Sequence, residues 1–321
     1  MHNRRTFQQI LAASLAPLAL IGMTFVPAAA FGQIAGAARP ANIPSGYVIT
    51  PAGYFHSSCV QRLAKGERLL ADGRVQHVDG TAAPSSAVCN YPSYSSAGLP
   101  LTATAAAPSV PEVNGWIENA AITTGSPTTS YGALIATWTV PPHPLANDGQ
   151  VLFLFPGFED INDTQSILQP VLQWYQGQWS LASWNCCLSG IVTASPAVYV
   201  NPGDVIYGSI TSTCPAGTVS CYYWNVLSLD LSTGESTTLN DTPSDGQVFN
   251  WAFGGVLEPY YVISCDDYPP NRRMTFDHVT VFDEYLHPIA EPQWSAASNS
   301  TQQPQCDYGV KTRPQEITVR Y

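Results

Sequence analysis

Short runs of apolar and aromatic residues recur along the chain from residue 133 to residue 282, and helical periodicity is nearly absent. Runs of this length, bounded by Gly, Pro, Asn, Asp and Ser, are typical of β-strands. Their spacing predicts an all-β fold, either an antiparallel sandwich or a barrel. The strands predicted in this way are 133–140, 151–155, 167–175, 198–200, 205–210, 222–229, 256–263 and 278–282.

The pattern is sharpest in residues 151–184, where two buried strands, 151–155 and 167–174, are joined by a turn. Side chains alternate between the two faces of a strand. The second strand therefore places Ile167, Gln169, Val171 and Gln173 on one face and Leu168, Pro170, Leu172 and Trp174 on the other. Two amides share a face, and the simplest interpretation of Gln169 is a polar residue on the solvated side of a sheet.

The first thirty residues form a targeting segment. Arg4 and Arg5 are followed by an apolar run and by Ala28–Ala30, a small-residue cleavage site. The Arg-Arg-x-Phe arrangement fits a twin-arginine export signal, which predicts a secreted bacterial protein, extracellular or periplasmic. No second long apolar span is present, so we expect no membrane anchor.

Composition divides the rest of the chain into two zones. Residues 31–111 hold a compact piece, 46–94, followed by an Ala/Pro-rich linker, and we expect a pro-segment there. Residues 112–321 are long enough to bury one large core and form the predicted β-sandwich domain. No internal repeat is visible.

Positive charge is almost confined to the ends of the chain. From residue 75 to residue 271 there is no Lys or Arg, whereas Asp and Glu number fifteen. Unpaired carboxylates repel one another at neutral pH and stop doing so when they are protonated, so this pattern favours adaptation to acid. It excludes nucleic-acid binding through a basic patch. Solubility alone remains the simpler alternative.

Eight cysteines in an exported chain predict disulfides rather than metal ligands. A zinc site is not expected, because the sequence has no CxxC pair and no two His at the spacing of metal ligands. Cys59 with Cys89, and Cys214 with Cys221, would each close a local loop. For the other four, Cys186, Cys187, Cys265 and Cys306, the pairing stays open. Because adjacent cysteines rarely bond to each other, we expect Cys186 and Cys187 to reach different partners.

The common hydrolase signatures are missing: there is no G-x-S-x-G, no HExxH and no Asp-Thr-Gly pair, and the six His are scattered. A resemblance appears instead at residues 155–159 (FPGFE) and 167–169 (ILQ). Their order and spacing are similar to those of the glutamic peptidases of the eqolisin type, which are secreted acid proteases with a β-sandwich (lectin-like jelly roll) fold.

Weaker motifs extend the resemblance over about residues 114–285. They are 136–141 (ATWTVP), 202–206 (PGDVI) and 229–236 (LDLSTGES), followed by 256–258 (VLE). The resemblance implies an endopeptidase without a cofactor, with Gln169 and Glu258 as the catalytic dyad on neighbouring strands. In that dyad Glu258 acts as general base and acid on water, and the Gln169 amide donates to the oxyanion.

Five further residues are predicted to bind substrate: Phe155, Glu159, Gln173, Trp174 and Trp184. The resemblance is incomplete here, because the family usually has Trp where Phe155 stands, Asp where Glu159 stands, and often an acid where Gln173 stands. These differences leave the dyad in place and change the polar network of the pocket. The Trp side chains could equally fill the core of the sandwich.

Two other functions remain open at this point. A lectin-like sandwich could bind or cleave polysaccharide with Glu159 and Glu258 as paired carboxylates, or the chain could be a non-catalytic surface protein. For a peptidase we expect a monomer whose partners are a protein or peptide substrate and an intramolecular pro-segment. Arg62, Lys65, Arg68 and Arg74 predict that this segment docks on the acidic domain by charge and is released by acid.

Overall fold

The computed structural model describes residues 39–70, 72–83, 89–101, 115–299 and 302–321. The chain divides into two units, Met1–Gln33 and Ile34–Tyr321, and every described residue belongs to the second. The predicted export signal and the linker that precedes residue 112 lie outside the described residues. Within them, no helix has both the length and the apolar character needed to cross a bilayer.

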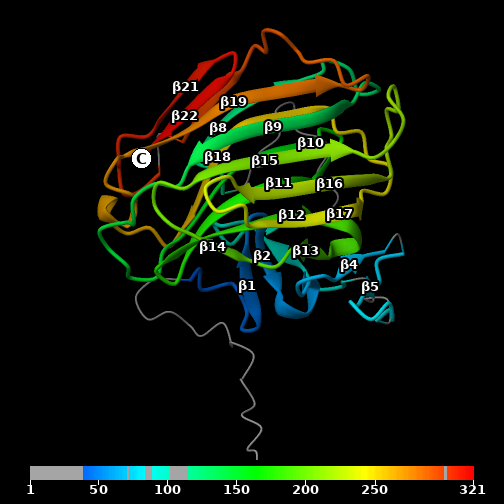
Figure 1. The fold of residues 1–321 in the computed structure, drawn as a ribbon. Helices are drawn as coiled ribbons and strands as arrows, with labels where there is room; N and C mark the ends of the chain where they lie inside the picture. The colour runs from blue at the N-terminus through cyan, green and yellow to red at the C-terminus, as the bar shows by residue number, and fades with distance from the viewer. Residues whose placement is uncertain (1–38, 71, 84–88, 102–114, 300–301) are drawn as a thin grey trace, which may run out of the picture. The chain divides into compact units, whose positions relative to one another are not determined.

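Two large sheets, mainly antiparallel, make up most of this unit (Figure 1). The first has nine strands in the order β20 (Ser295–Ser298), β8 (Glu118–Thr123), β18 (Trp251–Tyr260), β10 (Val151–Asp160), β11 (Asp163–Tyr175), β12 (Gln178–Cys186), β13 (Val192–Ala194) and β3 (Val60–Arg62), with β14 (Val198–Val200) paired to β12. The second has seven, in the order β17 (Ser236–Pro243), β16 (Tyr223–Asp230), β15 (Val205–Ser212), β9 (Tyr131–Thr139), β19 (Arg273–Asp283), β22 (Glu316–Arg320) and β21 (Gly309–Arg313).

Two small sheets belong to the N-terminal segment, the name used below for residues 39–101. One contains β1 (Tyr47–Thr50), β2 (Gly53–His56), β6 (Ser93–Tyr94) and β7 (Pro100–Leu101), and the other contains β4 (Arg68–Leu69) and β5 (Val75–Gln76). The helical turns are short 3-10 turns: Ser57–Cys59, Leu188–Gly190 and Cys265–Asp267.

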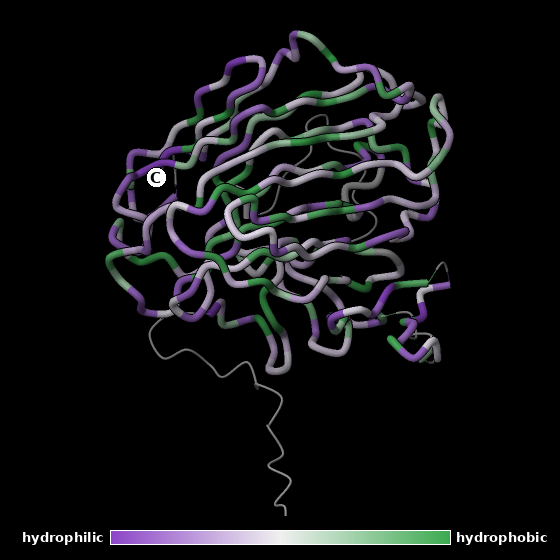
Figure 2. Tube along the Cα trace, in the orientation of Figure 1, coloured by the Kyte–Doolittle hydropathy of each residue, from purple (hydrophilic) through white to green (hydrophobic). Residues whose placement is uncertain are grey.

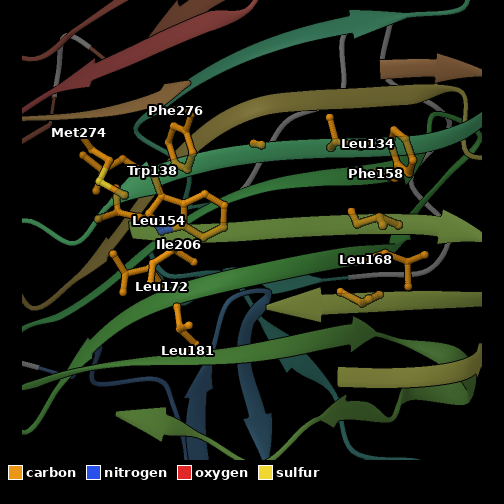
Figure 3. Packing of buried hydrophobic residues seen from close by; sticks show 14 of the residues in the cluster. Leu134, Trp138, Leu154, Phe158, Leu168, Leu172, Leu181, Ile206, Met274 and Phe276 are labelled. Atoms are coloured by element: carbon orange, nitrogen blue, oxygen red, sulfur yellow. The ribbon is translucent and has the colours of Figure 1, made fainter. Parts of the chain in front are cut away.

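The core lies between the two large sheets, where inward-facing side chains interdigitate (Figure 3). In β15, Ile206 and Ile210 are fully buried and the residues between them are partly exposed or lack a side chain. At Gly208 a Cβ atom would lie 2.6 Å from the Trp138 ring, so only glycine lets that ring pack there. Polar residues gather in the connections at the strand ends (Figure 2).

A second apolar cluster lies on the other face of the nine-stranded sheet. It joins Phe153, Phe155 and Val256 of the sheet to Tyr54 and Phe55 of the N-terminal segment. Both faces of the central strands are therefore covered, and every residue of β10 and of β18 is buried. The N-terminal segment forms the cover on this side.

The prediction of an all-β antiparallel sandwich is confirmed. Strand limits differ, because β10 runs five residues past the predicted end and β18 begins at Trp251 rather than at residue 256. The strand β12 was not predicted. Its sequence, QWSLASWNC, interleaves apolar residues with Ser and Asn, and only the structure shows that Ser183 and Asn185 are buried and hydrogen-bonded.

The N-terminal segment is joined to the sandwich by backbone pairing and by apolar packing. β3 pairs with β13 in parallel, and Leu63, Leu69 and Val75 enter the core cluster between the sheets. Two of the four cations that were predicted to dock this segment on the acidic domain bond within the segment instead. Arg74 pairs with Asp72, and Arg68 hydrogen-bonds to Gln76, all within the segment.

All eight cysteines are paired. The predicted pairs Cys59–Cys89 and Cys214–Cys221 are confirmed. The expectation that Cys186 and Cys187 reach different partners is wrong, because they are joined to each other. Cys265 and Cys306 lie with their Cα atoms 5.4 Å apart, well suited to each other, which leaves the adjacent pair no other partner. Among the described residues no group of three or more His, Cys, Asp or Glu could hold a metal ion.

Candidate active site

Gln169 lies in the middle of β11 and is completely buried. It shares the face of Ile167 and Val171, which belong to the cluster beneath the N-terminal segment. Its amide Nε2 donates to the carbonyl oxygen of Pro51 over 3.4 Å, a long hydrogen bond. Its Oε1 has no partner among the described residues. The interpretation of Gln169 as a solvated surface residue is therefore wrong.

Glu258 lies on β18, opposite Phe153 in the register, and is also completely buried. Its Oε1 is 2.7 Å from the hydroxyl of Tyr260, and that hydroxyl is 3.1 Å from the carbonyl oxygen of Thr50. The side chain of Trp116 also hydrogen-bonds to this carboxyl. Its Oε2 has no partner among the described residues.

Gln169 and Glu258 face the same side of the sheet, but they are not on neighbouring strands as expected. They are also offset along the strands, because Glu258 is level with Gln173, four residues or roughly 13 Å from Gln169. The register places β10 between them: Phe153 pairs with Glu258 on one side and with Gln173 on the other. Both side chains nevertheless reach the turn between β1 and β2. Gln169 contacts Pro51 O directly, and Glu258 reaches Thr50 O through the Tyr260 hydroxyl. Consecutive carbonyls of one peptide chain thus link the two residues.

Burial dominates the titration of Glu258. Loss of hydration raises the pKa of this carboxyl from 4.5 to about 8, although the hydrogen bonds from Tyr260 and Trp116 act in the opposite direction. Glu258 is therefore protonated below neutral pH while the N-terminal segment covers it. A tyrosine hydroxyl has one proton, so in that state the carboxyl donates to Tyr260 and Tyr260 donates to Thr50.

Four of the five predicted substrate-binding residues lie on this face. Phe155 and Trp184 belong to the same apolar cluster as Ile167 and Val171. Trp184 pairs with Gln169 in the register of β11 and β12. Gln173 donates through Nε2 to Ser180 Oγ over 3.0 Å. Glu159 pairs with Trp251 at the far end of β10 and is 6% exposed. The set spans the sheet rather than forming one pocket.

Trp174 does not belong with them. Its ring lies in the core between the two large sheets, tilted against Trp179 at 5.2 Å between ring centroids. This is the face opposite Gln169, as the alternation along β11 requires. A substrate on the Gln169 face has no access to Trp174, so its predicted contact with substrate is wrong.

Three contributors to the site were not predicted: Tyr260, Trp116 and the turn formed by residues 50–53. Tyr260 could have been found from the sequence, because it follows Glu258 by two positions and must share its face in a strand. Trp116 and the turn come from distant parts of the chain. No local pattern marks them as neighbours of Glu258.

A second buried carboxyl, Glu118, lies outside this site. It is on β8 opposite Leu257, a residue of the core between the sheets. Its Oε2 accepts from the backbone N–H of Arg320 over 2.8 Å and its Oε1 from Ser298 Oγ over 3.2 Å. Burial raises the pKa of Glu118 to about 8, although these hydrogen bonds oppose the shift.

We expect stability to fall as pH rises from about 4.5 to 8. Glu118 and Glu258 both have a folded-state pKa near 8 and an ordinary value of 4.5, so folding favours their protonated forms. Their contribution is complete below pH 4.5 and is lost as pH rises through 8. Melting curves at pH 4 and pH 8 should differ by at least about 5 °C, since 1 kcal/mol shifts the melting temperature by about 2–4 °C at this size.

The matched control is Glu118→Gln, which keeps an acceptor for Arg320 and removes the titration. This variant should show a smaller difference between the two pH values. Melting that is higher at pH 8 would contradict the prediction. The sequence attributes the loss of stability at high pH to repulsion between carboxylates. In the structure, burial is the main cause of the raised pKa of both Glu118 and Glu258.

Comparisons with known proteins give a limited result. No family model matches the chain, and no curated protein matches it. Solved structures that resemble it include scytalidoglutamic peptidase with a transition-state analogue inhibitor (16% identity, 64% of this chain and 98% of that one, TM-score 0.46). Others are SCP-B, a member of the eqolisin family, with the tripeptide Ala-Ile-His (15%, 64% and 98%, 0.46), and aspergilloglutamic peptidase from Aspergillus niger (17%, 53% and 98%, 0.36).

Proposed function

We propose that this protein is an exported, acid-active endopeptidase that hydrolyses peptide bonds with Glu258 and Gln169. One observation carries the proposal: both side chains are fully buried beneath one peptide turn, where Gln169 bonds to the Pro51 carbonyl and Glu258 is linked to the preceding carbonyl, that of Thr50, through the Tyr260 hydroxyl. A face that holds a peptide turn in this way has a carboxamide and a carboxyl with which to bind a substrate peptide and cleave it.

In the proposed reaction Glu258, once ionised, removes a proton from a water molecule that attacks the carbonyl carbon of the substrate. The negative charge that develops on the carbonyl oxygen accepts a hydrogen bond from Gln169 Nε2, which already donates to the Pro51 carbonyl. Glu258 then returns its proton to the leaving amine as the carbon–nitrogen bond breaks. An amide suits the oxyanion position because it does not titrate at acid pH.

The N-terminal segment then acts as an intramolecular pro-segment. The turn at residues 50–53 occupies the place of a substrate, and Pro51 presents a carbonyl to Gln169. The same turn keeps water from Glu258, whose raised pKa holds it protonated and unable to act as a base. Withdrawal of the turn would admit substrate and water and lower that pKa. The same turn therefore both fills the substrate position beside Gln169 and keeps Glu258 protonated.

The alternative of polysaccharide cleavage by Glu159 and Glu258 has a geometric difficulty. Phe153 pairs with Glu258, and Glu159 lies six residues further along the same strand. At about 3.3 Å per residue that places the carboxylates roughly 20 Å apart along the sheet. Paired carboxylates of glycosidases lie about 5–10 Å apart.

The test is to incubate the purified protein with denatured casein and with glucans from pH 2 to pH 7, adding pepstatin. We expect casein to be cleaved in the acid range, with pepstatin having no effect because no Asp-Thr-Gly pair is present. Release of sugar without release of peptide would support a carbohydrate-active sandwich. Cleavage of neither substrate at any pH in this range would contradict the proposed activity.

A further inference from the structure

A pocket of about 820 Å³ lies beyond the dyad, at the edge of the nine-stranded sheet. It is lined by β8, by the start of β18 and by the chain that follows β19. Its lining includes Asn119, Trp251, Asp283, Glu284 and Glu291. None of the lining residues takes part in the reaction proposed above.

The pocket borders β18, the strand that carries Glu258. Asn119 pairs in the register with Val256, two residues before Glu258 on the same strand. Trp251, at the other end of the pocket, pairs with Glu159, which pairs in turn with Ile167 on the face of Gln169. An extended chain bound at Glu258 can follow β18 towards Trp251, a distance of roughly 20 Å or about six residues.

Strand β8 offers a free edge at this place. β20 pairs only with residues 118–121 of β8, and in the described part of the chain no strand pairs with Ile122 or Thr123 on that side. Both residues line the pocket. An unpaired strand edge is a template for an added strand.

The charge of the pocket is one-sided. Its lining has three carboxylates and no Lys or Arg. Asp283 accepts from the backbone N–H groups of Tyr285 and His287, and its Oδ2 lies 3.4 Å from His287 Nδ1. Glu284 and Glu291 form no ion pair with a described residue. Trp251 also lines the pocket, with its ring packed against Phe253 at 4.2 Å between ring centroids.

Asn119 is an independent sign of a ligand. Its side chain lines the pocket, only 8% of the residue is exposed, and its amide has no hydrogen-bond partner among the described residues. Neither its Oδ1 nor its Nδ2 is among the fully buried atoms that lack a partner, so the amide can be reached from the pocket and is available to a peptide backbone. Asn119 lies between the dyad and the acidic end of the pocket.

We propose that this pocket binds an extended peptide segment that carries a Lys or Arg side chain, the backbone pairing with the free edge of β8 and the cation lying between Trp251 and Glu284. Binding of such a peptide does not depend on the proposed function. The further statement that the peptide is a substrate, with its basic residue about six positions from the cleaved bond, rests on that function.

The test is calorimetric titration of the full chain at pH 6 with two extended peptides that differ in one central residue, Lys or Glu. The Lys peptide should bind at least tenfold more tightly. The double variant Glu284→Gln/Glu291→Gln should remove that preference, while Glu235→Gln/Asp245→Asn, which makes the same charge change at exposed positions elsewhere, should keep it. A Lys peptide methylated on alternate backbone nitrogens should lose its binding, because it cannot pair with a strand.

Equal binding of the two peptides, or binding of neither, would overturn the proposal, as would a preference that survives Glu284→Gln/Glu291→Gln. Full binding of the methylated peptide would also overturn it. None of these measurements requires peptide cleavage. Failure of the proposed activity, seen with casein, is therefore distinguishable from failure of the pocket.

Discussion

Replacement of Glu258 by Gln should lower the rate of peptide cleavage by about 10³-fold or more while leaving the fold intact. The change is nearly isosteric and keeps an acceptor beside Tyr260, so packing at this fully buried position is preserved. It removes the group that takes the proton from water, and general-base catalysis is worth 10²–10⁴-fold. The initial rate of cleavage of a fluorogenic peptide by the full chain at acid pH measures the effect.

The matched control is Glu118→Gln. Glu118 is equally buried and also has a pKa raised to about 8, but it faces the core between the sheets. If Glu258 contributed only to stability, as Glu118 does, the two variants would lose activity in proportion to the fall in their melting temperatures. We expect Glu118→Gln to cleave at close to the parent rate. Retained cleavage by Glu258→Gln would rule out the mechanism.

Replacement of Gly53 by Ala should activate the full-length protein by about tenfold or more. Gly53 closes the turn between β1 and β2 with φ of +113°, and an added Cβ would lie 2.2 Å from the carbonyl oxygen of Tyr94. Backbone atoms cannot yield that space, so the turn must shift. A strain of 1–3 kcal/mol that is relieved when the turn leaves Gln169 and Glu258 changes the open population by roughly tenfold to a hundredfold.

The initial rate on a fluorogenic peptide, taken before any self-cleavage appears on a gel, reports this activation. Gly73→Ala is the control: Gly73 also has a positive φ, +76°, in a turn of the same segment, but no atom lies within 4 Å of its added Cβ. It should destabilise the turn between β4 and β5 without changing the rate. A Gly53→Ala variant no more active than the parent would show that the turn does not block the dyad.

Much of the fold, and the face of the sheet that each residue of β11 occupies, could be predicted from local sequence. Short apolar runs between turn formers predict strands, because side chains alternate along a strand and connections need Gly, Pro, Asn or Asp. The same alternation placed Gln169 and Gln173 on one face and Trp174 on the other. Two of the four disulfides followed from short spacing along the chain.

Only the tertiary structure decided the order of the strands and what covers them. β10 lies between Gln169 and Glu258, and a turn more than a hundred residues away in sequence bridges them. Neither fact has a local signal, because pairing between distant strands depends on the packing of the whole sandwich. The pKa of Glu258 is decided in the same way. Its sequence neighbours determine which face it occupies, whereas the loss of water that raises its pKa comes from residues folded over it from the other end of the chain.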